Sequence, residues 1–199
     1  MSKPTALRCG GHYHIFNRGN NRETIFREQR NYFYFIKLYE KYIPLVADTF
    51  AYCLLPNHFH FLVRIKDEQD CQSSEDWQSC SPSRAFSNLF STYTKAINKA
   101  YDRTGSLFEK PFKRLEVTSD AYFRRLIAYI HQNPQRHGLI DNFQLWPYSS
   151  YQTILSHKPT HIHREDVLTW FGDGKAYQAY HQEMETVRQL EGMVSEDFG

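Results

Sequence analysis

The chain has 199 residues, of which 41% are hydrophobic and 23% charged, a balance typical of a globular protein with one substantial core. No apolar run approaches the ~20 residues that a membrane helix needs, and the first residues lack the apolar stretch of a secretory signal. We therefore expect a cytoplasmic protein with no membrane partner. The 4 cysteines form no C-x-x-C pair, which argues against a zinc finger.

The net charge of +2 conceals two basic blocks. Residues 1–66 hold 10 Lys and Arg against 4 Asp and Glu, and residues 82–137 hold the same numbers. Residues 67–81 hold 5 acidic and no basic residues, and residues 138–199 hold 9 acidic against 4 basic ones. A basic body is typical of proteins that bind a polyanion such as nucleic acid, although uneven charge also occurs in proteins that bind none.

The first half of the chain alternates between strand and helix signals. Residues 11–17 alternate polar and apolar side chains, and a Gly-Asn-Asn turn follows. Apolar residues at three- and four-residue spacing predict a helix over 28–43, which ends before Pro44. The stretches 46–54 and 58–65 are rich in β-branched and aromatic residues and predict a hairpin.

The second half begins with an acidic, Ser- and Gln-rich stretch at 66–83, which predicts a mobile loop. A helix over 83–101 and a short basic strand over 112–118 follow. The next helix, over 119–133, must stop or kink at its Asn-Pro pair because proline disfavours helix both at its own position and before it. A weakly amphipathic C-terminal helix is predicted at roughly 164–190.

The order strand, helix, strand, strand, helix, strand, helix predicts the α+β class. We expect an antiparallel β-sheet covered by α-helices mainly on one face. We place one domain over residues 1–150 and a C-terminal helical extension over residues 151–199.

Two histidines flank Phe59 in one predicted strand. Because successive side chains alternate faces, His58 and His60 point the same way from Cα atoms ~6.6 Å apart, close enough to bind one metal ion, and Phe59 points into the opposite layer. An H-x-H pair also arises by chance in a chain with 10 histidines. His12 and His14 form a second such pair, so a four-histidine metal centre and simple packing in the sheet both stay open.

A second candidate lies in the segment AYIHQNPQRHG. Tyr129 and Asn133 are four residues apart and share one face of the predicted helix, whereas His131 lies about 200° around the helix from Tyr129. A nucleophile and a ligand could therefore be neighbours. Tyr129 also stands between Ile127 and Ile130, a position equally suited to a core residue.

Three segments together resemble a known family. They are YHIFNRGNN at 13–21, PNHFHFLV at 56–63 and YIHQNP at 129–134. Their sequence and order resemble those of the single-tyrosine HUH transposases, in particular the REP-associated tyrosine transposases, over roughly residues 10–150. The resemblance implies an HUH endonuclease fold with a ferredoxin-like palm.

The resemblance also implies the site and its reaction. His58, His60 and Asn133 would hold a divalent metal, Mg²⁺ or Mn²⁺, and Tyr129 would attack single-stranded DNA to give a 5′-phosphotyrosine and a free 3′-hydroxyl. Relatives differ in whether the third ligand is Gln or Asn. Two neutral imidazoles and an amide suit this chemistry, because they leave the metal its full positive charge for a phosphodiester.

The expected partner is a single-stranded DNA hairpin, bound by a monomer or a homodimer. Basic side chains near the motifs are expected to contact phosphate, although each could equally be a solvated charge. They are Arg18, Arg22, Lys110, Lys113, Arg114, Arg124, Arg125 and Arg136. Two alternatives stay open: a hairpin-binding protein that has lost cleavage, and a metallohydrolase of small phosphoesters that uses both H-x-H pairs.

Overall fold

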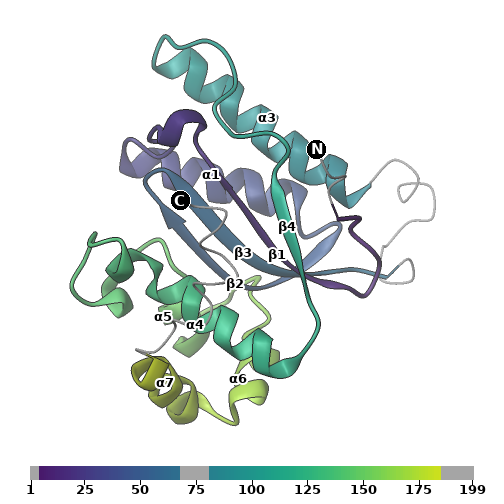
Figure 1. The fold of residues 1–199 in the computed structure, drawn as a ribbon, viewed down its shortest axis with the longest axis vertical. Coiled ribbons are helices and arrows are strands. Elements are labelled where there is room, and N and C mark those ends of the chain that lie inside the picture. The colour runs from purple at the N-terminus through teal and green to yellow at the C-terminus, as the bar shows by residue number, and fades with distance from the viewer. Residues whose placement is uncertain (1–4, 68–80, 185–199) are drawn as a thin grey trace.

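The computed structural model describes residues 5–67 and 81–184. Its centre is a four-stranded antiparallel sheet with the strand order β2-β3-β1-β4 (Figure 1). The strands are β1 (His12–Arg18), β2 (Ala47–Leu55), β3 (His58–Ile65) and β4 (Lys113–Val117). The longer helices are α1 (Gln29–Tyr42), α3 (Pro82–Ala100) and α4 (Asp120–Arg136).

The predicted α+β class and antiparallel sheet are confirmed. The bounds of the first six predicted elements agree with the structure to within one residue. The connectivity β1-α1-β2-β3-α3-β4, combined with this strand order, is that of the expected ferredoxin-like palm.

Helices cover both faces of the sheet, so the prediction that they lie mainly on one face is wrong (Figure 1). On one face, α1 and α3 pack against Phe59 and Phe61. On the other face, α4 contributes Ile127 to a second core that includes Phe50 and Leu62. β2 and β3 are buried along nearly their whole length, and strands buried on both faces need a cover on both.

Helix α4 continues through the predicted stop and ends only at Arg136, with Pro134 in its last turn. The proline lacks an N–H donor, so the helix loses the one backbone bond that residue 134 would otherwise donate to residue 130. The backbone N–H of His137 donates to the carbonyl of Asn133 and closes the helix. The Asn133 side chain also donates, through Nδ2, to the carbonyl oxygen of Tyr129 at 2.9 Å.

The C-terminal part contains α5 (Tyr151–Leu155), α6 (Arg164–Phe171) and α7 (Gly174–Glu183). The single helix predicted from residue 164 is therefore two helices. Gly172 interrupts it with a φ of 102°, a conformation that favours glycine. Asp173 then caps α7 by accepting a hydrogen bond from the N–H of Ala176 at 2.7 Å.

Some predictions fall partly outside the described residues. The predicted acidic loop at 66–83 falls mostly on residues 68–80, and the end of the predicted C-terminal helix falls on residues 185–190; neither stretch is described. The domain division at residue 150 stays a prediction. Among the described residues, no helix combines the length and the apolar character needed to span a bilayer.

Candidate active site

The H-x-H pair of β3 lies under α4. His58 and His60 face α4, and Phe59 belongs to the core on the opposite face, as the alternation of a strand predicts. The two imidazole rings lie 5.2 Å apart between centroids and are nearly perpendicular. Both side chains are buried, with His60 only 1% exposed.

Each of these imidazoles is held by a neighbour through its Nδ1 atom. The Nδ1–H of His58 donates to Oδ1 of Asn57 at 2.7 Å, and Nδ1 of His60 lies 2.9 Å from Nε2 of His14. Burial lowers the pKa of His58 to about 3 and lowers the pKa of His60 well below its ordinary value. Both rings are therefore neutral at neutral pH. Nε2 is then the atom that each ring would present to a cation, so the pair fits a divalent metal.

Helix α4 brings the candidate nucleophile to the same place. The ring of Tyr129 lies 5.6 Å from the ring of His60, nearly at a right angle. One turn later, the side chain of Asn133 lies within hydrogen-bonding reach of His58. The structure thus brings together the four residues that the sequence selected, and their catalytic and ligand roles stay predictions.

Two further side chains adjoin the site. The ring of His137 lies 4.9 Å from that of His58, and the guanidinium of Arg136 lies 5.2 Å from the ring centroid of Tyr129. Sequence reasoning missed His137 as a neighbour of the site. The signal was present, because Tyr129, Asn133 and His137 follow one another at four-residue spacing.

The second H-x-H pair does not complete a four-histidine centre. His12 packs among aromatic rings, 5.5 Å from Phe50 and 5.4 Å from Phe123 between centroids. It pairs with Arg64, which lies four residues and roughly 13 Å along β3 from His60. Within residues 5–67 and 81–184, no three His, Cys, Asp or Glu side chains form a group that could hold a metal. The expected ligand set contains only two such residues, because its third member is an amide.

Three of the eight predicted phosphate-contact residues surround this site. Arg18 pairs with His58 across the β1–β3 ladder. Lys113 pairs with Phe16, and directly opposed residues of an antiparallel pair share one face, here the face of His58. Arg136 is the third, above the tyrosine ring.

Three of the other five lie elsewhere. Arg114 reaches the opposite layer, where its Nη1 donates to Oγ of Ser83 at 2.8 Å. Arg124 and Arg125 lie toward the C-terminal helices, and Arg124 donates to the carbonyl of Trp170 at 3.4 Å. Arg22 and Lys110 are exposed. Phosphate contact stays a prediction for all eight residues.

Comparison with known proteins finds similarity both in sequence and in fold. No protein-family model matches the chain. A curated protein of Haemophilus influenzae, whose name proposes a REP-associated tyrosine transposase, is 25% identical over 105 residues, which are 52% of this chain. The chain spans 58% of that protein's length. A solved REP-associated tyrosine transposase bound to a REP hairpin superposes with a TM-score of 0.56 at 20% identity, covering 80% of this chain and 89% of that one.

The chain resembles the REP-associated tyrosine transposases. The resemblance that the three motifs predicted is therefore confirmed in sequence and in fold. Because the structural likeness to the REP-associated tyrosine transposase has low sequence identity, it concerns the fold alone.

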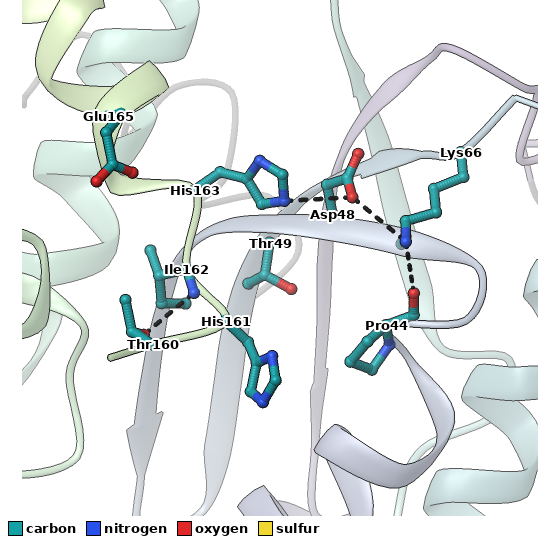
Figure 2. A pocket seen from close by; sticks show the side chains of 10 residues that line it. Pro44, Asp48, Thr49, Lys66, Thr160, His161, Ile162, His163 and Glu165 are labelled. Atoms are coloured by element: carbon teal, nitrogen blue, oxygen red, sulfur yellow. Dashed lines mark hydrogen bonds and ion pairs between the residues drawn. The ribbon is translucent and has the colours of Figure 1, made fainter. Parts of the chain in front are cut away.

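A polar cavity of about 350 Å³ lies at the N-terminal end of β2, between the end of α1 and the segment that leads to α6 (Figure 2). His163 and Lys66 reach Asp48 from opposite sides, at 3.3 Å and 3.7 Å. Lys66 also donates to the carbonyl of Pro44 at 2.8 Å. None of the predicted catalytic or metal-binding residues lines this cavity, and its contact between His163 and Asp48 joins the C-terminal part of the chain to the sheet.

Proposed function

We propose that this protein is a metal-dependent DNA strand transferase that nicks and rejoins single-stranded DNA beside a hairpin. The observation that carries the proposal is the close contact between two side chains of α4, Tyr129 and Asn133, and the two histidines of β3, His58 and His60. The similarity to REP-associated tyrosine transposases, one of them solved with a REP hairpin, supports a DNA hairpin as the partner.

In the proposed reaction, the phenolic oxygen of Tyr129 attacks the phosphorus atom of the scissile phosphodiester. The phenol loses its proton, the bond from phosphorus to the 3′ oxygen breaks, and that oxygen takes up a proton to become a free 3′-hydroxyl. The product is a 5′-phosphotyrosine that conserves the energy of the phosphodiester, so rejoining needs no ATP.

The buried imidazoles and the amide hold the reaction centre. A divalent cation on His58, His60 and Asn133 would polarise the non-bridging oxygens of the phosphate. The neutral state of both imidazoles leaves that charge undiminished. The bond from Asn133 to the carbonyl of Tyr129 ties the third ligand and the nucleophile into one helical turn, which fixes their relative position.

A covalent-adduct assay tests this function. A labelled DNA hairpin with a single-stranded flank is incubated with the protein and Mn²⁺ and then run on a denaturing gel. We expect a protein-linked band for the wild type and none for Tyr129→Phe, since only the nucleophilic oxygen is lost. Tyr122→Phe, on the same helix and only partly buried, is the matched control and keeps the band.

The same assay separates the alternatives. Hairpin binding without any adduct would identify a protein that binds but does not cleave. Turnover of nitrophenyl phosphate without an adduct would identify a metallohydrolase. An adduct that persists in Tyr129→Phe would place the nucleophile on another residue.

A further inference from the structure

The neighbour of His60 is another histidine from a different strand. His14 of β1 and His60 of β3 meet at 2.9 Å through Nε2 and Nδ1, with their rings stacked at 5.1 Å and 24°. Both side chains are fully buried, at 0% and 1% exposed. His14 belongs to the H-x-H pair of the first strand, to which the proposed function assigns no role.

The contact constrains which nitrogen of each ring carries the proton. Both rings are buried and their nitrogens meet directly at 2.9 Å, so one nitrogen of the contact must donate and the other must accept. Only one of the two contacting nitrogens, Nδ1 of His60 or Nε2 of His14, therefore carries a proton. If His60 is to present the lone pair of Nε2, its proton must sit on Nδ1 and be donated to Nε2 of His14.

We propose that His14 is a positioning residue, which accepts the Nδ1–H of His60 and so holds that ring with Nε2 toward a divalent cation. The inference rests on the proposed function and deepens it. Asn57 holds the ring of His58 by the same kind of contact, because its Oδ1 accepts the Nδ1–H of that ring at 2.7 Å. Each candidate histidine ligand therefore has its own acceptor behind it, the arrangement that orients metal-binding histidines in proteins.

The environment of His14 favours a functional role over a packing role. Its Nδ1 atom is buried and has no hydrogen-bond partner among the described residues. An unpartnered buried polar group costs stability, and an apolar ring would avoid that cost. Phe16, two residues along the same strand, already stacks on His14 at 4.6 Å and shows that an aromatic hydrocarbon fits this layer.

The test uses three variants and no DNA. His14→Phe removes the acceptor but keeps a ring of similar shape, and His14→Gln keeps an acceptor oxygen. His12→Phe is the matched control, because His12 points to the same face of β1 and packs against Phe123. Mn²⁺ affinity of the metal-free protein is measured by titration calorimetry, and the proton position on His60 by long-range nitrogen–proton NMR.

We expect His14→Phe to weaken Mn²⁺ binding by roughly 10- to 100-fold, the usual loss when such a supporting contact is removed. His14→Gln should recover most of that affinity, and His12→Phe should bind as the wild type does. In the metal-free wild type, the proton of His60 should sit on Nδ1, and His14→Phe should lose this preference.

Unchanged Mn²⁺ affinity in His14→Phe, or a wild-type His60 protonated on Nε2, would overturn the inference. A wild type that binds no Mn²⁺ would refute the metal site itself. The two failures are distinguishable, because the absence of a metal site is seen in the wild-type protein alone, whereas the failure of the inference is seen only when a metal-binding wild type is compared with its variants or its His60 is found protonated on Nε2. Melting temperatures of all proteins exclude unfolding as the cause, and recovery in His14→Gln separates a lost acceptor from a disturbed core.

Discussion

A buried pair of histidines on the face of α4 opposite the candidate active site should make stability depend on pH. Nδ1 of His131 on α4 lies 2.9 Å from Nε2 of His181 on α7. The Nδ1–H of His181 donates to the carbonyl of Tyr177 at 2.7 Å, so Nε2 of His181 accepts the proton of His131. Nε2 of His131 in turn accepts from the hydroxyl of Ser150 at 2.8 Å. This chain of hydrogen bonds requires both rings to be neutral.

The sign and size of the effect follow from the pKa values. Burial lowers the pKa of His181 to about 4, from 6.5 in the unfolded chain. Below pH 6.5 the unfolded chain therefore binds a proton that the folded chain excludes until about pH 4. The contribution of His181 to the free energy of unfolding is fully present above pH 6.5. It falls on acidification by up to about 1.4 kcal/mol per pH unit, and by roughly 3 kcal/mol in all.

The perturbation is His181→Phe, which removes the titrating group but keeps a ring in the core. We expect the variant to be less stable at neutral pH by roughly 1–3 kcal/mol, because the N–H of His131 loses its acceptor. Between about pH 7.5 and about pH 4.5, however, the wild type should lose ~2–3 kcal/mol more than the variant does. Urea unfolding in EDTA at several pH values measures both quantities.

The matched control is His157→Phe, at an exposed position, which should leave the pH slope unchanged. If His181→Phe and the wild type lose stability in parallel as the pH falls, His181 is not excluded from protonation in the folded state. That outcome would refute the assignment of hydrogen-bond donors and acceptors in the pair.

Three further predictions concern metal and DNA. His58→Ala and His60→Ala should each abolish Mn²⁺-dependent cleavage, whereas His12→Ala should keep measurable activity; equal loss in all three would restore the four-histidine alternative. A hairpin with a single-stranded flank should bind at least about tenfold more tightly than perfect duplex, and binding should weaken steeply with salt; gel-shift titrations at two salt concentrations decide this. Lys113→Glu should weaken hairpin binding more than Arg125→Glu, since only Lys113 shares the face of the catalytic groups; equal effects would count against this assignment of the DNA surface.

The order of elements could be predicted because each element carries its own local signal. Strand alternation, helical periodicity and turn residues are all properties of neighbouring residues. The face that each helix covers is not local. The near-continuous apolar run of β2, ADTFAYCLL, held the relevant signal, since a strand of an antiparallel sheet with one wet face would alternate. Reading that run as part of an ordinary hairpin led to the wrong arrangement of layers.

In the candidate site, too, local patterns predict some residues and miss others. His58 and His60 are two residues apart, and Tyr129 and Asn133 four apart, so the period of a strand and of a helix selects them. The contact of His14 with His60 depends on the register of two strands far apart in the sequence, which no local pattern reveals. His137 lies beyond the proline at which the helix was expected to end. Because the predicted helix stopped there, the sequence did not place His137 on the same helical face as Tyr129 and Asn133.

The two opposite faces of helix α4 make contacts of different kinds. One face carries Tyr129 and Asn133, joined by a side-chain hydrogen bond to the carbonyl of the tyrosine. The other face carries His131, whose buried contacts with Ser150 and His181 fasten the helix to the C-terminal part of the chain. A rigid helix transmits displacement from one face to the other, so the position of the candidate nucleophile depends on the hydrogen bonds that hold the opposite face. Loosening that network should therefore reduce adduct formation more than hairpin binding, because attack by the phenolic oxygen requires close alignment with the phosphate, whereas binding is spread over many contacts.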